Sequence, residues 1–265
     1  RQSIVLLKNK DKLLPLKKDI RTLAVIGPNA DNVYNMLGDY TAPQADGTVV
    51  TVLDGIRQKV SKETRVLYAK GCAVRDSSRT GFKDAIETAR NADAVVMVMG
   101  GSSARDFSSE YEETGAAKVT INQISDMESG EGYDRATLHL MGRQLELLEE
   151  ISRLGKPVVL VLIKGRPLLM EGAIQEAEAI VDAWYPGMQG GNAVADVLFG
   201  DYNPAGRLTL SVPRSVGQLP VYYNTRRKGN RSRYVEEPGT PRYPFGYGLS
   251  YTTFSYTDMK VQVTE

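Results

Sequence analysis

Cysteine, histidine and tryptophan are almost missing from this chain of 265 residues, which contains one of each. Cys72 cannot form a disulfide within the chain, and Cys72 and His139 alone cannot build a Cys/His zinc centre. A Ser-His-Asp triad would have to use His139 itself, which stands between two leucines and is more simply a packed or surface residue. Cys72 has no histidine nearby to activate its thiol. We therefore expect no metal centre and a structural role for Cys72.

Long hydrophobic runs and an excess of one charge are absent as well. The longest uninterrupted apolar run covers residues 157–163, whereas a membrane-spanning helix needs about 20 residues. Lys and Arg number 33 against 32 Asp and Glu, which leaves a net charge of +1. Without a field of one sign, neither nucleic acid nor a membrane is an expected partner. No signal peptide is recognisable, and we expect the chain to begin inside a longer protein.

Short apolar runs alternate with helical patterns along most of the chain. The runs are continuous, which is typical of strands buried on both faces. Predicted strands cover residues 22–26, 65–69, 94–99, 157–163 and 179–183, and predicted helices cover 51–60, 81–91, 141–154, 168–176 and 192–199. This rhythm predicts right-handed βαβ crossovers. We expect a doubly wound α/β fold with about five parallel strands, helices on both faces, and an antiparallel edge near residues 207–211.

Two stretches interrupt this rhythm, residues 100–140 and 213–251. A connection as long as the first, inside a compact domain, is usually functional or disordered. Near the C-terminus, residues 254–261 alternate like the first strand of another domain. The predicted organisation is therefore an α/β domain over residues 1–252, followed by a linker or the start of a truncated trailing domain over 253–265.

The first long connection contains the strongest candidates for chemistry. Glycines on both sides of Glu131 would let a carboxylate project from a loop. Tyr133 could stack on a sugar or a base, and Asp134 and Arg135 could pair and fix the loop. From the residues alone, a solvated acidic loop is the simpler interpretation.

Two further segments follow predicted strands. Residues 25–31 place a glycine turn after a strand, where α/β sheets often bind ligands, but they lack G-x-G-x-x-G and the lysine of a P-loop. A tight turn capped by Asn29 or Asp31 is the simpler interpretation. Residues 184–187, Trp-Tyr-Pro-Gly, end another strand and could line a ligand cleft or plug the sheet edge equally well.

Taken together, the motifs resemble the second, α/β-sandwich domain of glycoside hydrolase family 3, the β-glucosidase-like enzymes. The resemblance covers nearly the whole chain, in family order. The residues that carry it lie at 3–9, 14–16, 25–30, 38–40, 129–135 (Ser-Gly-Glu-Gly-Tyr-Asp-Arg), 164–167, 183–187, 190–191, 198–208 (Leu-Phe-Gly-Asp-Tyr-Asn-Pro-Ala-Gly-Arg-Leu) and 243–251 (Tyr-Pro-Phe-Gly-Tyr-Gly-Leu-Ser-Tyr).

The resemblance implies retaining hydrolysis of terminal β-linked sugars by two carboxylates from different domains. Glu131 matches the family's acid/base glutamate, with Glu128 as the alternative. Tyr133, Asp134 and Arg135 are expected on the leaving-group side of the substrate site. The nucleophilic aspartate belongs to an N-terminal (β/α)8 barrel that this sequence does not contain, so we expect the chain alone to be inactive. No cofactor is implied, and a periplasmic or secreted location is expected for the parent enzyme.

Two alternatives of other classes remain open. A stand-alone module that binds a carbohydrate or another small ligand would bind sugar without turnover. A regulatory or purely structural domain would do neither, and substitution of Glu131 would have no effect. The sequence does not indicate the sugar, the linkage, exo or endo action, or the oligomeric state.

Overall fold

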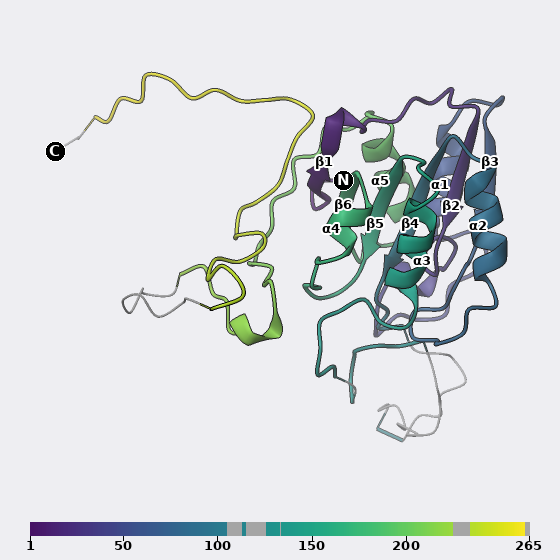
Figure 1. Cartoon of the computed structure of the whole chain (residues 1–265), viewed down its shortest axis with the longest axis horizontal. Helices are drawn as coiled ribbons and strands as arrows, with labels where there is room; N and C mark the ends of the chain where they lie inside the picture. Colours follow the sequence, from purple (N-terminus) through teal and green to yellow (C-terminus); the bar gives the residue numbers. More distant parts are fainter. Residues whose placement is uncertain (105–112, 115–125, 133, 225–233, 263–265) are drawn as a thin grey trace.

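A six-stranded sheet forms the centre of the computed structural model, which describes residues 1–104, 113–114, 126–132, 134–224 and 234–262 (Figure 1). In spatial order β1-β6-β5-β4-β2-β3, the strands are Val5–Asn9, Ala179–Trp184, Val158–Ile163, Ala94–Gly100, Thr22–Ile26 and Arg65–Ala69. Strands β2 to β6 are parallel to one another, and β1 runs antiparallel to β6. The predicted α/β fold with five parallel strands is confirmed.

Helices cover both faces of this sheet. Alternate residues of β4 point to opposite sides: Val96 and Val98 join the core under α1 (Val52–Lys59) and α5 (Gly190–Leu198). Val95, Met97 and Met99 join the core under α2 (Phe82–Arg90), α3 (Gln144–Ser152) and the short α4 (Ala173–Glu176). Every residue of β4 is buried, which explains why its sequence is continuously apolar. The sheet is therefore doubly wound, as predicted.

The antiparallel edge is not where the sequence suggested. We predicted it near residues 207–211, but the edge strand is β1, whose Val5 lies opposite Asp182 of β6. The backbone of Leu208 instead bonds to a loop: its N–H donates to the Tyr247 carbonyl over 2.9 Å, and its carbonyl accepts from Gly246 N over 2.7 Å. Strand β1 therefore takes the place beside β6, and on its other side Leu6 forms an isolated bridge with Leu249.

The helix predictions hold except at the fourth helix. Residues 168–176 were predicted helical, but α4 contains only Ala173–Glu176. Leu169 N donates to the carbonyl of Leu138, and Gly172 adopts a φ of +71°, so the chain before α4 does not follow a helical path. Three short 3₁₀ turns, Lys10–Lys12, Tyr34–Met36 and Val216–Gln218, complete the regular structure of the described residues.

Beyond the sheet, residues 252–262 are exposed and form neither helix nor strand, and this segment runs away from the α/β body in Figure 1. Whether residues 253–265 begin another domain stays a prediction.

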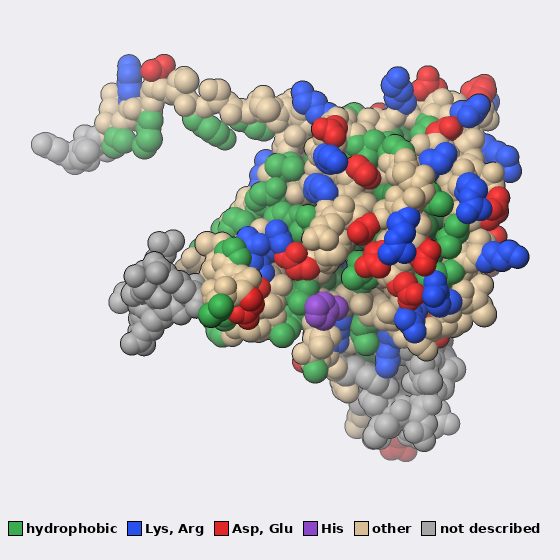
Figure 2. All heavy atoms as spheres, viewed as in Figure 1, with side chains coloured by type: hydrophobic (Ala, Val, Ile, Leu, Met, Phe, Trp, Pro, Cys, Tyr) green, Lys and Arg blue, Asp and Glu red, His purple; other side chains and the backbone are tan. Residues whose placement is uncertain are grey.

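Figure 2 shows blue and red side chains interspersed over the visible face, in keeping with the net charge of +1. Within the described ranges, no helix has the length and apolar character needed to cross a bilayer.

Candidate functional site at the carboxyl edge of the sheet

The carboxyl ends of β2, β4 and β5 are joined by a buried amide network. Asn29 follows β2, and its Nδ2 donates to the carbonyls of Gly101 over 3.1 Å and Ile163 over 3.3 Å. Its Oδ1 accepts from Asn35 Nδ2 over 2.7 Å, and Asn35 Oδ1 accepts from Ser102 Oγ over 2.6 Å. The sequence favours a tight turn capped by Asn29 or Asp31. For Asn29 the structure corrects this, because its fully buried side chain reaches across to the neighbouring strands.

Gln144, the first residue of α3, fixes the end of β4 from the other face of the sheet. Its Oε1 accepts from Gly100 N over 2.9 Å, and its Nε2 donates to the Gly100 carbonyl over 2.8 Å. Gly100 still lies opposite Ile163 of β5, and the amide bonds to its backbone N–H and carbonyl at the point where the long connection begins. A glutamine near a helix start gave no sequence signal for this contact, which depends on how α3 packs against β4.

Glu128 lies at the far end of the long connection, and its carboxylate is buried. Its Oε2 accepts from Arg135 Nη1 over 2.6 Å, and its backbone N–H donates to the Ser102 carbonyl over 2.8 Å. The side chains of Glu128 and Arg135 are 0% and 2% exposed. Burial raises the pKa of Glu128, although the guanidinium groups of Arg135, Arg166 and Arg75 oppose the shift. Glu128 is therefore enclosed within this chain.

The segment after Glu128 is held on the surface side by a second pair. Arg166 Nη1 donates to Asp134 Oδ1 over 2.8 Å, and this hydrogen bond holds the pKa of Asp134 below its usual value. Asp134 is exposed, so the contact is a solvated one. Arg135 also donates from Nη2 to the carbonyl of His139, whose own side chain is exposed. The predicted pairing of Asp134 with Arg135 is limited to a backbone contact, from Arg135 N to Asp134 Oδ1 over 2.7 Å.

Glu131 is exposed at the tip of this loop, as the flanking glycines predicted. Its backbone N–H donates to Asp39 Oδ2 over 3.3 Å, and Asp39 N in turn donates to Ser103 Oγ over 3.0 Å. Gly132 has a φ of +77°, a conformation that L side chains rarely adopt. Asp39 and Ser103 thus connect the loop to the edge of the sheet. Tyr133, one of the three predicted substrate contacts, lies outside the described residues.

A second buried ion pair stands at the ends of β5 and β6. Lys164 Nζ lies 2.6 Å from Asp182 Oδ2 and 3.9 Å from the centre of the Trp184 ring. Tyr185 follows, and its ring packs so closely on Gly165 that a Cβ there would lie 2.5 Å from it. Burial raises the pKa of Tyr185. Trp184 and Tyr185 thus pack against the two opposite cores of the sheet.

The described acidic side chains and Cys72 bear on two further kinds of chemistry, metal binding and thiol reactivity. Within the described ranges, no three His, Cys, Asp or Glu side chains are arranged so that they could hold a metal ion. Burial raises the pKa of the Cys72 thiol to about 12, with a further contribution from Asp126, so the thiolate is disfavoured at neutral pH. This agrees with the structural role predicted for Cys72.

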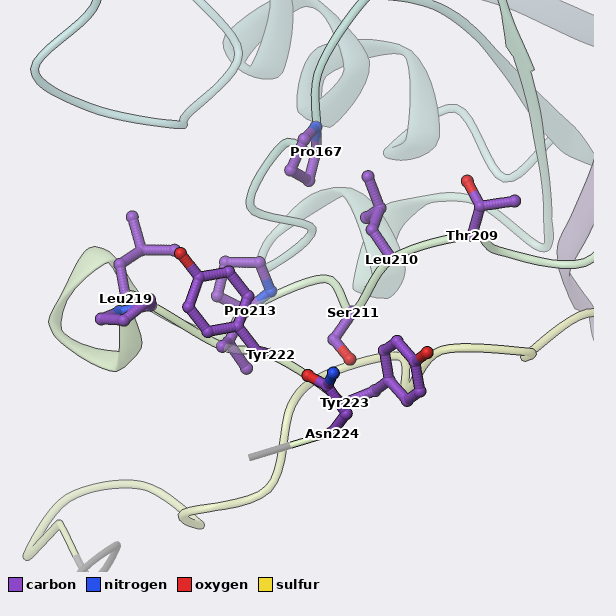
Figure 3. Close-up of a pocket in the computed structure, with 11 residues that line it drawn as sticks. Pro167, Thr209, Leu210, Ser211, Pro213, Leu219, Tyr222, Tyr223 and Asn224 are labelled. Carbon is purple, nitrogen blue, oxygen red and sulfur yellow. The ribbon is translucent and has the colours of Figure 1, made fainter. Parts of the chain in front are cut away.

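A separate hollow of about 620 Å³ lies where residues 209–224 pass Pro167 (Figure 3). Its lining is mainly apolar, and Leu210 points across it toward Pro167. Tyr223 stacks on Phe245 with ring centres 4.0 Å apart. Neither Glu128 nor Glu131 lines this hollow, so it is distinct from the acidic loop.

The sequence of this chain is similar to that of known proteins. Residues 4–251 match the family described as Glycosyl hydrolase family 3 C-terminal domain. A β-xylosidase of Formosa agariphila is 43% identical over 99% of this chain, and a periplasmic β-glucosidase of Salmonella typhimurium is 40% identical over 98%. The chain spans 34% and 35% of their lengths, about a third of each relative.

Solved structures give the same result. A β-glucosidase from Erythrobacter marinus superposes with a TM-score of 0.79 at 38% identity, over 96% of this chain and 34% of that one. A β-glucosidase from Listeria innocua, in complex with glucose, gives 0.76 at 32% identity, over 95% of this chain and 32% of that one. The family match covers residues 4–251, and the relatives match nearly the whole chain. The chain therefore belongs to the C-terminal domain family of glycoside hydrolase family 3.

Proposed function

We propose that this chain supplies the general acid/base of a retaining β-glycosidase and that Glu131 is that residue. The exposure of Glu131 at the carboxyl edge of the sheet is the observation that carries the proposal. Glu128, the alternative, is fully enclosed and paired with Arg135. It could meet a glycosidic oxygen only if the loop opened and left Arg135 as an unpaired buried charge, which is costly.

The proposed reaction has two steps. Glu131 first donates its proton to the departing glycosidic oxygen while a second carboxylate attacks the anomeric carbon. The Glu131 carboxylate then takes a proton from the water that releases the sugar. The second carboxylate is an aspartate on the N-terminal barrel that the resemblance implies. In retaining enzymes the two carboxyl groups are about 5–5.5 Å apart, so the position of the loop that carries Glu131 decides activity.

The names of the relatives support a substrate class. Their names describe β-xylosidases and β-glucosidases, so we propose terminal β-linked xylose or glucose units.

A catalytic acid must keep its proton near neutral pH, which requires burial or a neighbouring negative charge. Glu131 is exposed in this chain. The barrel wall and its aspartate would supply both conditions, so the chain alone should not turn over glycosides.

The first experiment measures aryl β-glycoside release by the isolated chain, alone and mixed with the barrel domain. No release above buffer is expected from the chain alone, because one carboxylate cannot form the covalent intermediate. Turnover by the chain alone that survives Glu131→Gln would refute the proposed chemistry. Sugar binding by the chain without a role for Glu131 would favour the stand-alone binding module.

The second experiment places Glu131→Ala in the full-length enzyme. Alkyl glycosides and natural oligosaccharides, whose leaving groups need a proton, should slow by about 10²–10⁴-fold. Aryl glycosides with acidic phenols should slow far less in the first step, and azide should partly restore the second step because an anion needs no general base. Glu63→Ala, which removes an exposed glutamate just before β3, is the matched control and should change neither rate. Equal losses for both substrate kinds would indicate a structural role for Glu131.

A further inference from the structure

The loop that presents Glu131 is joined at its base by one buried ion pair. Glu128 precedes Glu131 and Arg135 follows it, and their side chains meet at 2.6 Å. Each partner makes a second contact: the Glu128 N–H donates to the Ser102 carbonyl just after β4, and Arg135 Nη2 donates to the His139 carbonyl in the segment that leads to α3. The backbone that carries Glu131 therefore leaves and re-enters the protein at two connected points.

The surroundings leave this pair little freedom. A Cβ added to Gly101 would lie 1.9 Å from Glu128 Oε1, so the carboxylate packs directly on the backbone that follows β4. Just before Glu128, Arg75 Nη1 donates to the Met127 carbonyl over 2.7 Å, and Arg75 N donates to Asp126 Oδ1 over 3.1 Å. The base of the loop is thus fixed from two further segments of the chain.

Burial of the Glu128–Arg135 pair carries a desolvation cost. Burial raises the pKa of Glu128 despite Arg135, and burial lowers the pKa of Arg135 despite Glu128. Both shifts favour the neutral forms, so desolvation outweighs the attraction between the two charges. Glu128 Oε1 and Arg135 Nε are in addition buried without a hydrogen-bond partner in the described part of the chain. Buried pairs of this kind can often be replaced by apolar side chains with no loss of stability.

We infer that Glu128 and Arg135 are positioning residues that hold Glu131 at the place where it meets the glycosidic oxygen. This inference rests on the proposed function, in which Glu131 is the acid/base. It gives Arg135 a role different from the substrate contact that the resemblance implied, because a side chain 2% exposed has no surface to offer a sugar. The charge pair specifies one loop conformation through its directional contact, which apolar side chains would not do.

The test replaces the pair as a unit, with Glu128→Met and Arg135→Met together in the full-length enzyme. The urea midpoint of unfolding should stay at or above that of the parent protein. The kcat for alkyl glycosides should fall by about 10–100-fold, because a misplacement of about 1 Å can cost that much, while KM changes little. Aryl glycosides with good leaving groups should lose much less in kcat/KM, which reports the first step, while their second step should slow and azide should partly restore it, because Glu131 is also the base of that step. A structural defect would lower both rates together, and that result would overturn the inference.

Three comparisons separate the possible failures. Adding the pair replacement to Glu131→Ala should cause no further loss for alkyl glycosides, because the pair acts only through Glu131; an additive loss would overturn the inference. If Glu131→Ala shows leaving-group dependence but the pair replacement behaves like the parent enzyme, the inference fails while the proposed function stands. If Glu131→Ala shows no such dependence, the proposed function itself fails.

Two more variants guard against misfolding and unspecific effects. Glu128→Gln keeps the shape of the side chain and removes its charge, and should give the same leaving-group pattern with a loss of about 2–10-fold if a charge-assisted contact holds the loop. Lys59→Met disrupts an ion pair with Asp196 between α1 and α5, away from the loop, and should leave both kcat values unchanged. A Glu128→Gln enzyme with parental rates on alkyl glycosides would contradict the inference even if the double variant did not fold.

Discussion

The contact between Gly101 and Glu128 allows the packing of the site to be tested in the isolated chain. With Gly101→Ala, the new methyl carbon would lie 1.9 Å from Glu128 Oε1 and 2.5 Å from its Cδ. Favourable contacts between heavy atoms begin near about 3.5 Å. The carboxylate would have to retreat by roughly 1.5 Å, and it lies in a buried position 2.6 Å from Arg135.

The cost follows from what such a retreat breaks. Separating one partner of a buried ion pair typically costs about 3–5 kcal/mol, and overpacking alone costs about 1–3 kcal/mol. The two do not add, because movement of the carboxylate relieves the overlap. We expect Gly101→Ala to lower the free energy of unfolding by about 2–4 kcal/mol, a large part of the 5–15 kcal/mol typical of a domain.

Urea unfolding followed by circular dichroism measures this loss, and a second background identifies its cause. In a Glu128→Ala chain the carboxylate is gone, so adding Gly101→Ala should cost less than about 1 kcal/mol. Gly217→Ala is the control, because its new carbon would meet only Ser215 Oγ, at an ordinary 3.4 Å. The same cost for Gly101→Ala with and without Glu128 would refute the reasoning.

Three other predictions concern the same chain. The Cys72 thiol, with its pKa raised to about 12, should react with a thiol reagent at pH 8 only after unfolding; fast labelling of the folded chain would contradict its burial. Gly55→Ala would place a carbon 2.2 Å from the Gly191 carbonyl where α1 meets α5, and should lower the free energy of unfolding by about 2–4 kcal/mol, against little change for Gly217→Ala. Because the pKa of Glu128 is raised in the folded state, its contribution to stability is fully present below the unfolded value of about 4.3 and is lost as the pH rises through the folded value. We expect the urea midpoint of the parent chain to decline across that pH range. The urea midpoint of the Glu128→Gln chain should show no such decline.

The parallel core was predictable because its signal is local. Strands buried on both faces need continuous apolar residues, and β4 and β5 have them without interruption. Strand β1 lacks that signal: it is short, ends in Lys8 and Asn9, and becomes a strand only by pairing with β6, far along the chain. An edge strand is defined by its partner, which no sequence window contains.

The candidate site likewise combines features that the local sequence predicts with features that depend on distant contacts. The exposure of Glu131 follows from its glycine neighbours, which are visible in the sequence. The burial of Arg135 does not, since an isolated arginine is normally exposed and becomes buried only with a partner. The interpretation of Asn29 as a local cap fails for the same reason: its hydrogen bonds go to Gly101 and Ile163, residues close to it only because parallel strands end at one edge.

These two kinds of information meet in one short loop. Between Glu128 and Arg135 the chain passes from a fully buried carboxylate to an exposed one and back to a buried guanidinium. Such a reversal needs backbone conformations that ordinary residues resist, and Gly130 and Gly132, with φ values of +156° and +77°, provide them. Glycine makes the excursion possible but also leaves it conformationally free. A directional buried contact at the base then selects one path, which is why flexible residues and a costly ion pair occur together around Glu131.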